Sequence, residues 1–221
     1  MKLYGQPNFG NPRRVSIFLA EKGLEIPFES KAIADNGGLK GAWFLSKNPF
    51  GRIPVLEFDD GFCISETIAI CRYFESLRPA PSLFGVDPIE QAIIEMWQRR
   101  VELEMFVPMT GYVRHTAPEM ARVEPVQIPQ WGELCRVRVE QGLHILDRQL
   151  ENNEFIAGAH FSVADITAVH QLLGMPGILG VKVPDDCPHL RRWLIAVAAR
   201  PSVASTQPDN FGLIQGLARA S

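Results

Sequence analysis

The sequence lacks the cysteine and histidine patterns of a disulfide scaffold, a redox motif or a zinc site. None of its four cysteines belongs to a C-x-x-C pair or stands at zinc-like spacing from a histidine, and none precedes Cys63. The five histidines include no H-x-x-x-H pair. We therefore expect no metal site. A chain of 221 residues can also bury a sizeable core without disulfides or metals.

A large excess of charge and a long apolar run are also absent. The net charge is −3, which gives no electrostatic reason to expect nucleic acid or an anionic membrane as a partner. The longest apolar-leaning run, residues 166–183, contains His170, Gln171 and Pro176, so it is a poor membrane span. The N-terminus has neither the basic flank nor the apolar stretch of a signal peptide. We expect a soluble, cytoplasmic protein.

Short strand and helix patterns alternate over residues 1–78. Asn11 suits an N-cap and Pro12 the first helical position, while Asp60-Gly61 is a hairpin signal. Ser65 is the expected cap of the following helix. The resulting order, β-α-β-α-β-β-α, is that of an α/β thioredoxin-like domain. Expected strands cover residues 2–5, 27–33, 54–58 and 62–64, and expected helices cover 11–23, 39–46 and 65–77.

Prolines and glycines mark a linker at 79–87, after which strand patterns vanish. We expect an all-helical domain over 88–221, kinked near Pro108. The segment Ser162 to Asp165 fits a capping box at a helix start. Two apolar stripes at helical spacing support this assignment, namely Ile94, Trp97, Val101 and Met105, and Val139, Leu143, Leu146 and Leu150.

Two neighbouring features could bind an extended, peptide-like ligand. Ile53-Pro54 precedes a strand: a trans proline would only begin an edge strand, whereas a cis turn would offer the Ile53 backbone to a ligand as an added strand. Ser65-Glu66 opens a helix. The pair can be an ordinary cap with an acidic first turn, or it can receive the carboxylate and ammonium of an amino-acid head group. Spacing alone leaves both alternatives open.

Together these segments resemble a family signature. Residues 48–56, NPFGRIPVL, followed by 65–70, SETIAI, resemble the glutathione-binding signature of cytosolic glutathione transferases. The resemblance extends over most of the chain and implies a thioredoxin-like domain that holds glutathione, with a helical domain that supplies most of the acceptor pocket. It also implies a homodimer, in which Phe50 is either an anchor between subunits or a local core aromatic.

The resemblance assigns glutathione contacts residue by residue. It implies that Pro54 is cis, that the Ile53 backbone pairs with the cysteinyl part of glutathione, and that Ser65 and Glu66 hold its γ-glutamyl end.

Two basic residues complete this set. Lys40 stands where related members place a cation for the glycyl carboxylate, or it is a solvated helix lysine. Arg52 contacts the ligand or faces water.

The residue that activates the thiol is harder to assign. In this family a Tyr, Ser or Cys after the first strand donates to the thiolate, but here Phe9 occupies the serine position and no cysteine is near. Tyr4 lies inside the first strand, so we expect its hydroxyl to point elsewhere. The remaining donors are the side chains of Asn8 and Asn11 and the backbone N–H groups of Phe9, Gly10 and Asn11. We rank Asn8 first and Asn11 second as the thiolate contact, and the positive charge of Arg13 third.

Three functions follow from the resemblance. The first is transfer of glutathione to an electrophilic, fairly apolar acceptor. The second is glutathione-dependent reduction of disulfides or peroxides, and the third is a non-catalytic assembly module. Ser65 and Glu66 argue against the module, because a scaffold needs no head-group site. Candidates for the acceptor pocket, which could equally be core or interface residues, are Phe9, Met105, Met109, Tyr112 and Val113.

Overall fold

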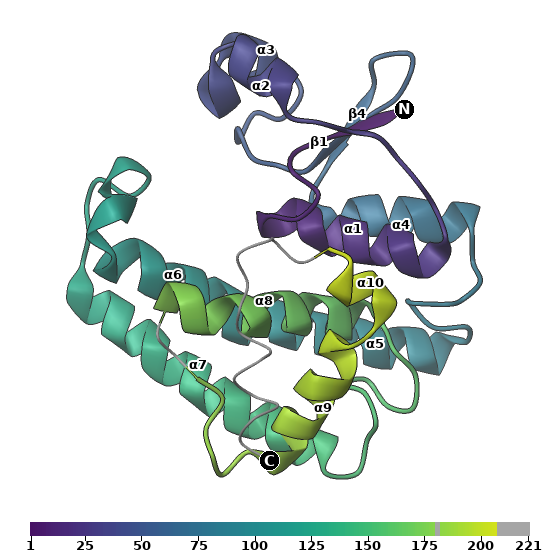
Figure 1. Ribbon diagram of the computed structural model, residues 1–221, viewed down its shortest axis with the longest axis vertical. Coiled ribbons are helices and arrows are strands. Elements are labelled where there is room, and N and C mark those ends of the chain that lie inside the picture. Colours follow the sequence, from purple (N-terminus) through teal and green to yellow (C-terminus); the bar gives the residue numbers. More distant parts are fainter. Residues whose placement is uncertain (180–181, 207–221) are drawn as a thin grey trace. The chain divides into compact units, whose positions relative to one another are not determined.

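The computed structural model describes residues 1–179 and 182–206 (Figure 1). The predictions for residues 207–221 lie outside this part of the chain. The described residues divide into two compact units: residues 1–83 with 200–206, and residues 84–179 with 182–199. The boundary between residues 83 and 84 falls inside the linker expected at 79–87.

The first unit contains a four-stranded sheet in the order β2-β1-β3-β4. β1 pairs parallel with β2 and antiparallel with β3, and β3 pairs antiparallel with β4. The expected strand over 27–33 is too long, because the backbone turns into a helix after Glu29, whose Oε1 accepts a hydrogen bond from the Ala32 N–H at 3.0 Å. The strands are β1 (Lys2–Tyr4), β2 (Phe28–Glu29), β3 (Val55–Glu57) and β4 (Cys63–Ser65).

Helices cover both faces of this sheet. Figure 1 shows α1 and α4 side by side below the sheet and α2 with α3 above it. Tyr4 and Val55, a cross-strand pair, share one core cluster with Ile33 of α2 and Phe44 of α3. The helical segments of this unit are α1 (Gly10–Lys22), α2 (Lys31–Asp35), η1 (Gly38–Lys40), α3 (Ala42–Leu45), α4 (Thr67–Leu77) and α10 (Pro201–Ala204).

The N-cap of helix α1 lies two residues earlier than expected. Its N-cap is Phe9, with no side-chain cap, and Asn11 and Pro12 are its second and third residues rather than cap and first residue. The first four N–H groups of a helix have no intrahelical partner, so Pro12 sacrifices no hydrogen bond at this position. The C-terminal stop at Gly23 is confirmed, with φ of 61°.

Helix α10 packs on α1, although the sequence assigned residues after 199 to the helical domain. Arg200 forms two hydrogen bonds with the Glu21 carboxylate, at 3.0 and 2.8 Å. Ser202 also donates to Glu21. These polar contacts, which join residues about 180 positions apart, attach the segment to the first unit.

The second unit is helical over its described residues, apart from an isolated bridge between Phe155 and Gly158. Both expected apolar stripes are buried. The backbone forms one π-helical turn just before Pro108, at the site of the expected kink. The segments are α5 (Pro88–Val101), η2 (Glu102–Phe106), α6 (Val107–Thr116), η3 (Pro118–Arg122), α7 (Pro129–Leu150), α8 (Val163–Leu179) and α9 (Pro188–Ala198). Among the described residues, no helix is long and apolar enough to cross a membrane.

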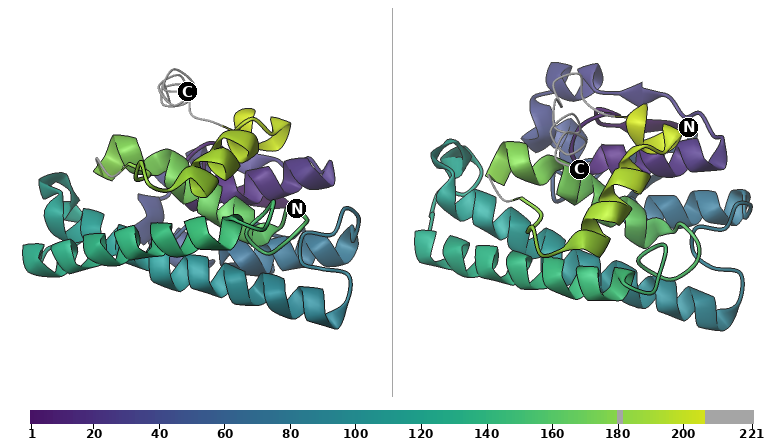
Figure 2. Two further views of the ribbon diagram at one scale, coloured as in Figure 1. Left: turned by 90° about the horizontal axis from the view of Figure 1, so that it is seen from below. Right: turned by 60° about the horizontal axis from the view of Figure 1, so that its bottom comes forward.

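Helices η2 and α6 run antiparallel to α7, and Figure 2 shows α7 lying along them. Two glycines of α7 allow the close approach. A Cβ at Gly132 would lie 2.5 Å from the Thr116 side chain, and one at Gly142 would lie 2.9 Å from Met105. Larger residues at either position would push the helices apart.

The capping residues at the start of α8 form a buried polar network. Asp165 accepts hydrogen bonds from the Ser162 N–H and hydroxyl, both at 3.0 Å, and from the Ile156 N–H and Trp193 Nε1. The Ser162 hydroxyl donates to the carboxylate instead of capping a backbone N–H, so one half of the expected capping box is present.

Candidate ligand-binding site

Three segments far apart in the sequence meet at one end of the sheet. Val55 pairs with Tyr4 on one side and with Ser65 on the other. The residues just beyond these pairs therefore lie close together: Gly5 after β1, Pro54 before β3 and Glu66 after β4. A Cβ at Gly5 would lie 3.7 Å from the Ile53 Cβ, which places the start of the β1–α1 loop beside Ile53.

The loop before β3 is held by a buried asparagine. The Ile53–Pro54 bond is cis, as the resemblance implies. Asn48 is 1% exposed; its Nδ2 donates to the Arg52 carbonyl at 2.8 Å and its Oδ1 accepts from the Phe50 N–H at 3.1 Å. Sequence reasoning gave Asn48 no role, although an Asn-Pro pair before an aromatic residue and Gly is a turn signal that could have identified it.

The helix after β4 begins one residue later than expected. Ser65 was predicted as the N-cap, but it is paired with Val55 in the sheet and keeps an extended backbone. Glu66 is the N-cap instead, and its carbonyl accepts the first helical hydrogen bond from the Ile70 N–H at 3.0 Å.

The backbone of Glu66 is strained. It has a φ of 70°, and it is the one non-glycine residue with positive φ in the described part of the chain. Such a conformation costs about 1–3 kcal/mol and persists where the surrounding structure enforces it. Strain of this kind gathers at ligand sites, which makes Glu66 a candidate for a functional position.

The two basic candidates lie on the loop and beside it. Lys40 Nζ donates to the Phe50 carbonyl at 3.1 Å, and the Lys40 and Arg52 side chains are exposed. Gly51 has a φ of 58°, and a Cβ there would lie 2.5 Å from the Leu39 carbonyl oxygen. The close approach at Gly51 thus brings Lys40 next to the segment that leads into Ile53.

The turn that carries the thiol candidates is fixed at both ends. The Phe9 N–H donates to the Gln6 carbonyl at 3.2 Å, and the Ser16 hydroxyl donates to the Pro7 carbonyl at 2.8 Å. Asn8 lies exposed within this turn. The bond to Gln6 occupies the Phe9 N–H, one of the backbone donors considered for a thiolate.

Asn11 lies in the first turn of α1 and is half-buried. Its Oδ1 accepts a long, 3.5 Å hydrogen bond from Arg14. The N–H groups of Gly10 and Asn11 belong to the four that a helix start leaves without intrahelical partners. This end of α1 therefore offers backbone and amide donors to a ligand.

The Arg13 side chain is engaged in the fold. It is 3% exposed and donates to the carbonyls of Thr206 at 3.0 Å and Val203 at 3.3 Å, at the end of α10. Burial lowers the pKa of Arg13 to about 10, which still leaves it protonated at neutral pH. Two carbonyls already receive its hydrogen bonds, and its role near a thiolate stays a prediction.

Tyr4 is also engaged elsewhere, as expected. Its hydroxyl donates to Glu57 Oε2 at 2.6 Å, and Glu57 also pairs with Lys47. Burial and the Glu57 carboxylate raise the pKa of Tyr4 well above its usual value. A neutral hydroxyl committed to Glu57 explains why a donor to a ligand must come from another residue.

The acceptor-pocket candidates have different surroundings. Phe9 is 64% exposed in the first unit. In the second unit Met105 and Met109 are buried, with Met105 against Gly142 of α7, whereas Tyr112 and Val113 are half-buried. The two methionines thus contribute to the core of their unit. A pocket formed by all five residues stays a prediction.

An open hollow of about 860 Å³ lies elsewhere in the first unit, between α1 and the segment that leads into β2. Its lining includes Pro7, Ser16, Leu24 and Phe28, and excludes Pro54 and every other candidate for glutathione. The candidates for glutathione therefore lie outside this hollow, and an extended ligand that pairs with the backbone of a strand needs no deep cavity.

Known proteins resemble the chain along most of its length. The family model described as glutathione S-transferase, N-terminal domain, matches residues 11–77, and the corresponding C-terminal domain model matches residues 133–201. The chain is 38% identical to glutathione S-transferase 2 of Saccharomyces cerevisiae over 205 residues, which are 92% of this chain and 88% of the yeast protein.

Solved structures agree. A glutathione S-transferase domain-containing protein of Marinobacter aquaeolei is 37% identical with a TM-score of 0.85, over 92% of this chain and all of that one. Gtt2 of Saccharomyces cerevisiae is 36% identical with a TM-score of 0.83, over 93% of this chain and all of that one. The chain therefore belongs to the glutathione S-transferase family and is a glutathione transferase.

Proposed function

We propose that the chain binds glutathione across the end of its sheet and transfers it to an electrophilic, fairly apolar acceptor. The observation that carries this proposal is the register of β3 against β4, in which Val55 pairs with Ser65. That pairing brings the backbone of Ile53 and Pro54, which lies just beyond the paired residues of β3, next to the helix start at Glu66. Glutathione needs both features at once. Its middle residue pairs with a protein backbone, and its charged head group binds at a polar helix start.

The γ-glutamyl end of glutathione carries an ammonium and a carboxylate. The Glu66 side chain is exposed and supplies a negative charge for the ammonium. The Ser65 hydroxyl and the first N–H groups of α4, which lack intrahelical partners, are donors for the carboxylate. One helix start thus serves both charges.

The glycyl end carries the second carboxylate of the ligand. Lys40 and Arg52 are exposed cations on and beside the loop that leads into Ile53. The ammonium of Lys40 has three donors and uses one for the Phe50 carbonyl, so it keeps capacity for a carboxylate. Arg52 can add charge without a fixed geometry.

The thiol lies between these two ends, beside Ile53. A cysteine-like thiol has a pKa near 8.5, so only about 3% is thiolate at pH 7. Lowering that pKa by roughly 2 units requires about 2.7 kcal/mol of preferential interaction with the thiolate. Hydrogen bonds from Asn8 and Asn11, with the field at the start of α1, are the means we assign, in that order.

The reaction then needs only the acceptor. The thiolate sulfur attacks the electrophilic carbon and forms a C–S bond, and the leaving group departs with the bonding electrons. For an acceptor with an activated double bond, a proton is added instead. The exposed aromatic ring of Phe9 is the side chain of the first unit that we assign to the acceptor. We place the enzyme in the cytoplasm as a homodimer.

Calorimetry with reduced glutathione and ultraviolet titration of the bound thiol test the proposal. We expect binding together with a thiol pKa below that of free glutathione. A model aryl halide assayed beside a small disulfide separates the transferase from a reductase. A protein that fails to bind glutathione at millimolar concentration would overturn the proposed site.

A further inference from the structure

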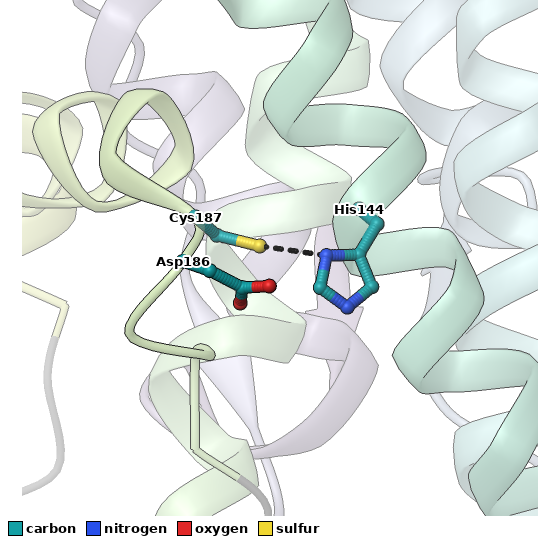
Figure 3. A group of neighbouring side chains, drawn as sticks. All are labelled: His144, Asp186 and Cys187. Carbon is teal, nitrogen blue, oxygen red and sulfur yellow. Dashed lines mark hydrogen bonds between the residues drawn. The ribbon is translucent and has the colours of Figure 1, made fainter.

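A second cluster of chemically active side chains lies in the helical unit. His144 is on α7, while Asp186 and Cys187 form the turn that leads into α9 (Figure 3). The Cys187 Sγ lies 3.2 Å from the His144 Nδ1. One ligand atom from each of the three residues lies within 4.8 Å of the others. Figure 3 shows the sulfur and the carboxylate directed to the same side, toward the imidazole ring.

We propose that His144, Asp186 and Cys187 form a binding site for a thiophilic divalent cation such as Zn²⁺. Imidazole nitrogen, thiolate sulfur and carboxylate oxygen are the donors that zinc takes from proteins. Three protein ligands with water in the fourth position complete a tetrahedral shell. The three residues belong to the helical unit, whereas the candidates for glutathione belong to the first unit, and the proposal does not depend on them.

The separations fit one ion after a small movement. Bond lengths of about 2.0–2.3 Å put the ligands of one tetrahedral zinc roughly 3.5 Å apart. The nitrogen and sulfur already meet that spacing at 3.2 Å. Because all three ligand atoms lie within 4.8 Å of one another, the carboxylate must approach by about 1.3 Å at most to reach it. Asp186 is an exposed turn residue, so its side chain can rotate at little cost.

The surroundings hold the two inner ligands in place. Asp147, one turn after His144 on α7, accepts the Leu190 N–H at 2.8 Å and so fixes the start of α9 against α7. The Cys187 N–H donates to the Pro184 carbonyl at 3.2 Å, which closes the turn. Cys187 is fully buried and His144 half-buried, so an ion would lie at the edge of the core with water reaching one side.

A catalytic cysteine is the competing interpretation of a Cys–His pair, and the environment argues against it. Cys187 is fully buried and lies beside the carboxylate of Asp186. A reactive cysteine needs the opposite, a lowered pKa and exposure. A cation, in contrast, gains from nearby carboxylates and displaces the thiol proton when it binds.

A bound ion would cross-link helices α7 and α9. The bound ion would join the last third of α7 to the start of α9, where Arg192 already donates to the Leu150 carbonyl at 2.7 Å. We expect Zn²⁺ to raise the midpoint of thermal unfolding, because it binds the folded chain preferentially.

The test titrates Co²⁺ as a spectroscopic probe into the full, untagged chain kept reduced, followed by competition with Zn²⁺. We expect one equivalent to bind, with a thiolate-to-cobalt charge-transfer band and the intense visible bands of a tetrahedral site. Cys187→Ser should abolish the charge-transfer band. Asp186→Asn should weaken binding by roughly tenfold or more, since even outer partners of metal ligands are worth about 10- to 100-fold.

Two matched controls make the result specific. Asp185→Asn removes the neighbouring exposed carboxylate, which pairs with Arg191, and Cys135→Ser removes another buried thiol of the same unit. Both should bind Co²⁺ like the unmodified chain. The proposal is overturned if no stoichiometric binding occurs, or if the band survives in Cys187→Ser. Asp186 is exposed, so Asp186→Asn decides the matter even if Cys187→Ser fails to fold.

Discussion

Val55 and Ser65 face each other across the antiparallel strands β3 and β4. This pair aligns the end of the Asn48–Pro54 loop with the start of α4. It also explains why Ser65 cannot cap that helix: a residue held in the sheet keeps an extended backbone. The cap position passes to Glu66, which takes a φ of 70° to make the turn.

Glu66→Gly should separate stability from binding. Glycine accepts positive φ without steric cost. In urea denaturation we therefore expect the free energy of unfolding of Glu66→Gly to exceed that of Glu66→Ala by about 1 kcal/mol or more. Both variants lose the carboxylate, and we expect both to bind glutathione more weakly than the unmodified chain. Equal stability of the two variants would show that the Glu66 backbone is unstrained.

Asn8→Ala and Asn11→Ala test the thiolate contact. We expect Asn8→Ala to raise the pKa of bound glutathione and to lower kcat near neutral pH by about 10- to 100-fold, with partial recovery at alkaline pH. Asn11→Ala should have a smaller effect. The control is Asn36→Ala, an exposed asparagine at the end of α2. If kcat and the thiol pKa match the unmodified enzyme in both variants, neither side chain stabilises the thiolate.

Arg13→Gln distinguishes a structural role from a catalytic one. The change leaves the carbonyls of Val203 and Thr206 without their charged donor, so we expect a loss of about 1–3 kcal/mol in the free energy of unfolding. In the folded variant we expect little change in the pKa of bound glutathione. A raised thiol pKa at unchanged stability would instead place Arg13 near the sulfur.

Glu57 should contribute to stability in a pH-dependent way. Partial burial acts to raise its pKa, but hydrogen bonds from Lys47 and Tyr4 outweigh that effect and the pKa is lowered. A lowered carboxyl pKa stabilises the fold above the unfolded-state value, roughly 4.3, and this contribution is lost as the pH falls through the folded-state value.

The comparison is between the unmodified chain and Glu57→Gln. Denaturant unfolding should show the larger loss of stability in the unmodified chain as the pH is lowered from about 5 to 3. Parallel curves would mean that Glu57 has the same pKa in the folded and unfolded states.

Phe50→Ser tests the proposed dimer anchor. Phe50 is 66% exposed in the single chain, so its ring is not a core aromatic of this unit and is accessible to a partner. We expect a shift from dimer to monomer in analytical ultracentrifugation. Phe62→Ser is the matched control, because Phe62 is 62% exposed in the same unit. Dissociation in Phe62→Ser alone would move the interface away from Phe50.

The sequence determined the features that depend on local chemistry. Alternating apolar residues and the Asp60-Gly61 turn predicted the β3–β4 hairpin, and the 3.6-residue period predicted the buried stripes of α5 and α7. The signature from Asn48 to Ile70 identified the family, and it predicts the segment that binds the ligand. Each of these signals lies within a few residues of chain, where sequence pattern and backbone conformation are directly linked.

The tertiary structure decided what depends on contacts between distant residues. It moved the cap from Ser65 to Glu66 through strand pairing and directed Arg13 to the carbonyls of α10. It also brought His144 to Cys187 across 43 positions. No local pattern records such contacts, because periodicity shows which face of an element is buried but not which element buries it.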